Sequence, residues 1–150
     1  MHMKITICSS ASFYKHVIEI KNELEALGHT VFVPHNALQM HQNNDYDVGH
    51  YKTWFDNAGD YHKKSHLIRQ HFDEIAKADV TLVVNDEKHG VANYIGGNVL
   101  MEMAIAFYLK QKIFLYGDVP EGSAFEEEIK GMMPISLQGD LTKISEKSSS

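Results

Sequence analysis

Residues 79–107 read DVTLVVNDEKHGVANYIGGNVLMEMAIAF, and the prediction of the fold starts from this stretch. Val80–Val84 is a nearly continuous apolar run, which is typical of a central parallel strand covered on both faces. A loop containing Gly96 and Gly97 follows, and Asn98–Lys110 then has the composition of a buried helix. A buried strand, a loop and a helix in this order form the repeating unit of parallel α/β sheets.

The same alternation of strands and helices continues on both sides of this stretch. The other expected strands are Met3–Cys8, Thr30–Val33, Lys112–Tyr116 and Ile135–Leu137. The other expected helices are Ser12–Leu27, His62–Lys77 and Ser123–Met132. Because parallel strands need crossover connections, we predict a three-layer α/β fold with a five-stranded parallel sheet, either flavodoxin-like or Rossmann-like.

The chain of 150 residues has the length of one domain, which we expect at residues 1–138. Residues 139–150 are expected to form a flexible C-terminal tail. Residues 35–61 are longer than the usual connection in a compact domain and predict a loop or lid insertion. The aromatic side chains of this insertion suit either stacking on a nucleobase or anchoring of the loop itself.

The composition excludes several classes of protein. A net charge of -6 is unfavourable for a nucleic-acid-binding surface, which needs clustered Lys and Arg. The single cysteine, Cys8, excludes an internal disulfide framework and reads as a small buried hydrophobe. No apolar run has the length of a membrane span. We therefore expect a cytoplasmic protein that is bound neither to a membrane nor to nucleic acid.

Glu102 is the one charged residue inside the apolar helix and is the principal candidate for chemistry. A capping box would need Ser, Thr, Asp or Asn at the position of Val99, so that role is excluded. A carboxylate that only stabilises the helix dipole near the helix start is the structural alternative. An ionised carboxylate buried without a partner costs several kcal/mol, and a partner or a ligand is therefore implied. A carboxylate kept ionised near a helix start can attack the anomeric carbon of a sugar.

Other candidates lie where the predicted strands end, because ligands of parallel α/β sheets bind beyond the carboxyl ends of the strands. Substrate-binding candidates are Ser9, Ser10, Ser12, Asn85, Gly96, Gly97 and Asn98. Asp86 in the same region is a candidate for proton transfer. Serine, asparagine and aspartate also favour turns, so a purely structural role remains the alternative for these side chains.

The segments HFDEIAKADVTLVVND, NYIGGNVLMEMAIAFYLKQKIFLYGDVPE and EEEIKGM resemble the nucleoside 2-deoxyribosyltransferase-like superfamily, which includes 2′-deoxynucleoside 5′-monophosphate N-glycosidases. The resemblance covers about Leu67–Leu141 and the initial KITICSS. It implies that Glu102 is the nucleophile that cleaves an N-glycosidic bond. It also implies that Cys8–Ser12 and Gly96–Asn98 hold the sugar and, in the monophosphate branch, its 5′-phosphate.

The sequence departs from the pattern of the superfamily at two places. The first loop has serines where the superfamily usually has glycine and, in the monophosphate branch, a phosphate-binding arginine. Counting back without gaps from Ala78 puts His71 where the superfamily often has an aspartate. A histidine donates a proton near neutral pH more readily than an ionised aspartate does, so we expect His71 to assist the departing base.

The expected function is cleavage or transfer at the N-glycosidic bond of a nucleoside or its 5′-monophosphate, with no metal and no organic cofactor. The resemblance implies a homodimer, because sites in the superfamily are often completed by a neighbouring subunit. One alternative is a phosphoribohydrolase that resembles the lysine-decarboxylase-like type, although the proline and Gly-Thr pair of that type are missing. Another alternative is a nucleotide-binding sensor that keeps the pocket without turnover.

Overall fold

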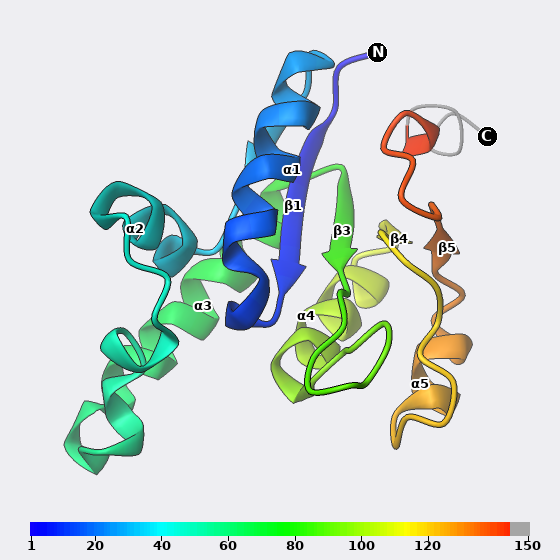
Figure 1. Cartoon of the computed structure of the whole chain (residues 1–150). Helices are drawn as coiled ribbons and strands as arrows, with labels where there is room; N and C mark the ends of the chain where they lie inside the picture. The colour runs from blue at the N-terminus through cyan, green and yellow to red at the C-terminus, as the bar shows by residue number, and fades with distance from the viewer. Residues whose placement is uncertain (145–150) are drawn as a thin grey trace.

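The computed structural model describes residues 1–144, and residues 145–150 lie outside the described part. Its centre is one sheet of five parallel strands in the order β2-β1-β3-β4-β5 (Figure 1). The strands are β1 (Lys4–Ser9), β2 (Thr30–Phe32), β3 (Val80–Val84), β4 (Lys112–Leu115) and β5 (Ile135–Ser136). The predicted three-layer α/β fold with a five-stranded parallel sheet is therefore confirmed.

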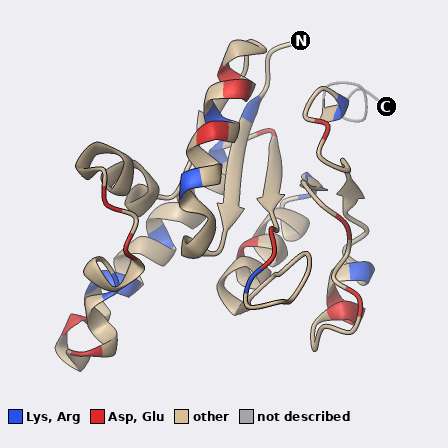
Figure 2. Ribbon diagram, in the orientation of Figure 1, with Lys and Arg blue, Asp and Glu red and all other residues tan. Residues whose placement is uncertain are grey.

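Within residues 1–144, the α-helices α1 to α5 connect or follow these strands. They are α1 (Tyr14–Ala26), α2 (His35–Asn43), α3 (Tyr61–Lys77), α4 (Gly97–Tyr108) and α5 (Glu126–Gly131). Within residues 1–144, none of the helices is long and apolar enough to cross a membrane. Lys and Arg positions are spread among Asp and Glu positions over these elements (Figure 2), which differs from the clustered basic residues of a nucleic-acid-binding face.

The sheet has a separate hydrophobic core on each face. Successive side chains of a strand point to opposite faces, so Ile7 of β1 packs with α1 while the adjacent Cys8 packs against α3 and α4. In the same way, Leu82 of β3 belongs to the first core and Val83 to the second. Coverage on both faces explains why β3 is apolar at nearly every position.

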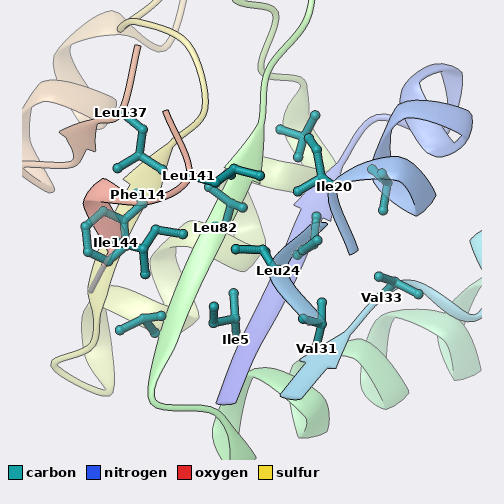
Figure 3. Packing of buried hydrophobic residues seen from close by; sticks show 14 of the residues in the cluster. Ile5, Ile20, Leu24, Val31, Val33, Leu82, Phe114, Leu137, Leu141 and Ile144 are labelled. Atoms are coloured by element: carbon teal, nitrogen blue, oxygen red, sulfur yellow. The ribbon is translucent and has the colours of Figure 1, made fainter. Parts of the chain in front are cut away.

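The C-terminal residues up to 144 belong to the folded domain, contrary to the flexible tail expected from residue 139. Leu141 is 4% exposed and Ile144 is fully buried, and both belong to the core on the α1 face of the sheet. Figure 3 shows them among the side chains that pack on this face, together with Phe114 and Leu82. The remainder of the expected tail, residues 145–150, lies outside the described residues.

The insertion at residues 35–61 contains helix α2 and three short 3-10 turns, η2 (Val48–His50), η3 (Thr53–Phe55) and η4 (Ala58–Asp60). This segment and the first turns of α3 stand out from the sheet at the lower left of Figure 1. Trp54 is only 4% exposed, whereas the neighbouring Phe55 is 71% exposed. The indole therefore anchors the insertion, and the neighbouring phenyl ring does not.

We expect Ile144→Ala to lower the free energy of unfolding by about 2–5 kcal/mol, because the fully buried side chain would leave a cavity against the sheet. Urea unfolding followed by circular dichroism measures the change. The control is Thr142→Ala at an exposed position nearby, for which we expect a change within about 0.5 kcal/mol. Equal effects of the two substitutions would show that Ile144 does not pack as described.

Candidate active site

A cavity of about 200 Å³ lies where β1 and β3 end, in the position where parallel α/β sheets bind ligands. Its wall is formed by the loop after β1, by helix α2 and the rest of the insertion, by α3 and by the start of α4. Lys88 and Tyr94 of the loop after β3 complete it. The cavity therefore brings together segments that are far apart in the sequence.

Glu102 lies at the bottom of this cavity on the second turn of α4, and is only 4% exposed. It faces inward because Val99, Met103 and Ala106 of the same helix are buried against the sheet. The side-chain amide of Asn98, one turn earlier, donates a hydrogen bond to Oε1 of Glu102 at 3.3 Å. One carboxylate oxygen is thus held by its own helix.

The other carboxylate oxygen of Glu102 faces His71 on α3. Nε2 of His71 is 3.0 Å from Oε2 of Glu102, and both side chains are at most 7% exposed. On the other side of the ring, Nδ1 of His71 is 3.2 Å from Oε2 of Glu74, which lies one turn later on α3. A doubly protonated imidazole donates to both carboxylates, so the ring orientation of His71 is fixed from both sides.

The two members of this pair shift each other's ionisation. Burial raises the pKa of Glu102 to about 7, although the positive charges of His71 and Lys64 oppose this shift. Burial lowers the pKa of His71, but Glu102 and Glu74 outweigh it, and the pKa lies above its ordinary value. A carboxyl group with a pKa of about 7 in contact with a histidine whose pKa is raised suits acid–base and nucleophilic chemistry.

Lys64 connects the insertion to this carboxylate. Its Nζ donates a hydrogen bond to Oδ1 of Asn98 at 3.0 Å and lies 5.6 Å from the ring centre of Trp54. Asn98 in turn donates to Glu102, so a chain of two hydrogen bonds joins Lys64 to the carboxylate. The ammonium group of Lys64 thereby contacts both the indole of Trp54 in the insertion and the side-chain amide of Asn98, which orients Glu102.

A second polar cluster lines the cavity at the loops after β1 and β3. Nζ of Lys88 donates a hydrogen bond to Oγ of Ser10 at 3.1 Å and lies 4.9 Å from the ring centre of Tyr94. A Cβ at Gly96 would come within 2.9 Å of the hydroxyl of Tyr94, whereas one at Gly97 would meet no neighbouring atom within 4 Å. A side chain at position 96 would therefore push against the ring of Tyr94, whereas a Cβ at position 97 would have no neighbouring atom in its way.

A structure with this architecture is known. A 2-deoxyribosyltransferase from the psychrotolerant bacterium Bacillus psychrosaccharolyticus superposes with a TM-score of 0.50 over 75% of this chain and 70% of that chain, at 22% sequence identity. The chain has a nucleoside 2-deoxyribosyltransferase-like fold. This confirms the resemblance seen in the sequence at the level of the fold. No family model and no curated protein sequence matches the chain.

Within this nucleoside 2-deoxyribosyltransferase-like fold, most of the site residues expected from the sequence line one cavity. They are Ser9, Ser10, His71, Gly96, Gly97, Asn98 and Glu102. Among them, His71 and Glu102 come from different helices and are in direct contact. The count that put His71 near the site therefore led to a residue in direct contact with the proposed nucleophile.

Three of the expected site residues lie outside the cavity wall. Ser12 is exposed, and its backbone N–H donates to Oγ of Ser10. Asn85 is buried and binds the next loop, donating to the carbonyl of Asp118 and accepting from the N–H of Gly117. The carboxylate of Asp86 lies 2.7 Å from Nδ1 of His16. The side chains of Asn85 and Asp86 thus contact neighbouring segments around the site and not the cavity.

Sequence reasoning missed three lysines and one glutamate of the site. They are Lys52, Lys64, Glu74 and Lys88. Two of them carry a signal in their spacing from His71, because Lys64 lies seven residues earlier and Glu74 three residues later on the same helix. Lys52 and Lys88 lie in irregular segments, where spacing does not indicate which way a side chain points.

Proposed function

We propose that the protein is an enzyme that cleaves or exchanges the N-glycosidic bond of a nucleoside or its 5′-monophosphate, with Glu102 as the nucleophile. The observation that carries this proposal is the buried contact of 3.0 Å between Glu102 and His71 at the bottom of a cavity. Its position beyond the strand ends of a nucleoside 2-deoxyribosyltransferase-like fold supports a sugar-containing substrate.

The proposed reaction has two displacements at the anomeric carbon. A carboxylate oxygen of Glu102 forms a bond to C1′ while the bond from C1′ to the base nitrogen breaks and its electron pair leaves with the base. The departing base takes up a proton. Water or a second base then attacks C1′ and releases Glu102, which gives hydrolysis in the first case and transfer in the second.

His71 has two roles in this proposal. Its positive charge stabilises the ionised form of Glu102 before the attack, which the burial of the carboxylate otherwise opposes. It is also the buried titratable cation beside the nucleophile, and we assign it the proton that the departing base receives. Asp86 receives no role, because it lies outside the cavity wall and faces His16.

The lysines of the cavity favour a 5′-monophosphate over a neutral nucleoside. Lys52, Lys64 and Lys88 all line the cavity, although the whole chain has a net charge of -6. Lys88 lies against Ser10 of the loop after β1, the loop that lacks an arginine. We propose that Lys88 supplies the positive charge for the phosphate from the neighbouring loop and that Ser10 adds a hydroxyl donor.

We further propose a cytoplasmic homodimer. Helix α4 is apolar except at Asn98 and Glu102, and Met101 and Tyr108 on its outer side are 43% and 81% exposed. A second copy of the chain that packs there would cover these side chains, as the resemblance to the superfamily implies. The cytoplasm fits a chain whose single cysteine, Cys8, is a buried free thiol.

We expect Glu102→Gln to lower the rate of base release by at least about a thousandfold, because the amide cannot attack C1′. Chromatography of nucleosides and 5′-monophosphates incubated with each protein measures the free base. The control is Glu87→Gln, an exposed carboxylate in the loop after β3 that should leave the rate unchanged. Nucleotide binding without any base release by the wild-type protein would contradict the proposal and indicate a sensor.

We expect kcat/KM of the wild type to rise with pH through about 7, because Glu102 must be ionised to attack. In His71→Phe the acid limb should move to higher pH, since the charge that lowers the pKa of Glu102 is lost. The pH–rate profiles of both proteins test this, with His16→Phe as a histidine control outside the cavity wall. An unshifted limb in His71→Phe would exclude the proposed coupling.

We expect Lys88→Met to raise KM for a 5′-monophosphate at least about tenfold while KM for the parent nucleoside changes little, because a hydrogen bond to a charged group contributes about 1.5–3 kcal/mol. Steady-state kinetics with both substrates measure the difference. The control is Lys15→Met, an exposed lysine close to the same loop in sequence. Equal changes in KM for the two substrates would show that Lys88 does not bind the phosphate.

A further inference from the structure

The thiol of Cys8 lies beside the Glu102–His71 pair and takes no part in the reaction proposed above. Its Sγ is 3.5 Å from Nε2 of His71, the same nitrogen that lies 3.0 Å from Oε2 of Glu102. The three donor atoms lie within 4.8 Å of one another, and all three residues are buried. In the part of the chain that the structure describes, no other three such donors converge in this way.

Two of the separations between these donor atoms are close to those of a tetrahedral zinc site. Zinc binds sulfur at about 2.3 Å and nitrogen or oxygen at about 2.0–2.2 Å, so neighbouring ligand atoms stand roughly 3.3–3.6 Å apart. The distance of 3.5 Å from Cys8 to His71 matches this range, and that of 3.0 Å from His71 to Glu102 is slightly shorter. A small outward shift of Glu102 would admit an ion between the three donors.

The surroundings of the three donors also suit a divalent cation. Glu74 accepts the Nδ1 proton of His71 at 3.2 Å, so a metal that displaces the Nε2 proton would find the Nε2 lone pair directed at it. A coordinating thiol loses its proton outright, so one thiolate and one carboxylate would cancel the two positive charges of the ion. The buried site would then carry no net charge, which burial favours. A sulfur, nitrogen and oxygen donor set selects zinc-like ions over magnesium or calcium.

We propose that Cys8 Sγ, His71 Nε2 and a carboxylate oxygen of Glu102 form a binding site for a zinc-like divalent cation, with its fourth position open to the cavity. Glu102 and His71 both line the cavity, which provides the path for the ion, and Cys8 lies directly behind them. Where Glu102 acts as the nucleophile, as proposed above, an ion bound here would compete with the substrate for it. The binding itself is independent of any reaction.

Cadmium chloride added to the metal-free protein tests this site without a substrate. Cys8 is the only cysteine in the chain, so an ultraviolet thiolate-to-cadmium absorption band reports this one position. We expect the band to saturate at one equivalent of Cd²⁺ while far-ultraviolet circular dichroism stays unchanged. The thermal unfolding midpoint should rise with Cd²⁺, because the ion binds the folded state.

Variants separate this site from adventitious binding. Cys8→Ala should lose both the band and the thermal shift, and Glu102→Gln and His71→Phe should each weaken Cd²⁺ binding at least about tenfold. The matched control is His50→Ala, which removes an exposed histidine 2.7 Å from Asp45 and should leave the band unchanged.

Three results would overturn the proposal. They are the absence of a thiolate band, a band that appears only as the circular dichroism is lost, and a band that neither Glu102→Gln nor His71→Phe weakens. If Cys8→Ala does not fold, the wild-type band and the other two variants decide. Disproof of this metal site would leave the proposal of an N-glycosidic reaction untouched, because base release is measured in a separate experiment.

Discussion

The buried contact between Glu102 and His71 is the interaction on which the candidate site depends. A carboxylate inside an apolar helix would cost several kcal/mol without a partner, and that partner has to come from another element. The sheet meets this requirement by holding α3 and α4 side by side on one of its faces, with Ile75 and Met103 in the same core. Glu74 then fixes the far side of the imidazole. The packing of α3 against α4 therefore also sets the contact between His71 and Glu102.

The parts that could be predicted from the sequence are those in which periodicity and burial agree. The strand Val80–Val84 is buried on both faces and is apolar throughout, so its place at the centre of the sheet followed directly. Glu102 stands out because the residues on both sides of it, Val99–Met101 and Met103–Phe107, are all apolar. His71 was found by counting along a helix that joins β3 after a two-residue connection, where an uninterrupted count keeps its register.

The parts that could not be predicted depend on the direction of side chains in irregular segments. Asn85 and Asp86 were placed correctly at the end of β3, but their side chains turn to Gly117 and His16 and away from the cavity. Lys88 approaches Ser10 only because the loop between β3 and α4 folds back on itself. The C-terminal segment was taken for a tail because its two buried residues are too few to show a period.

The buried position of Ile144 has a consequence for the biosynthesis of the protein. The three strands β1, β2 and β3 emerge from the ribosome before β4 and β5, which are added at one edge of the sheet, and can pair before these are translated. Phe114, however, shares its core with Leu137, Leu141 and Ile144, which are made after it. Until translation has passed residue 144, that side of the nascent sheet presents an uncovered apolar surface to which chaperones can bind.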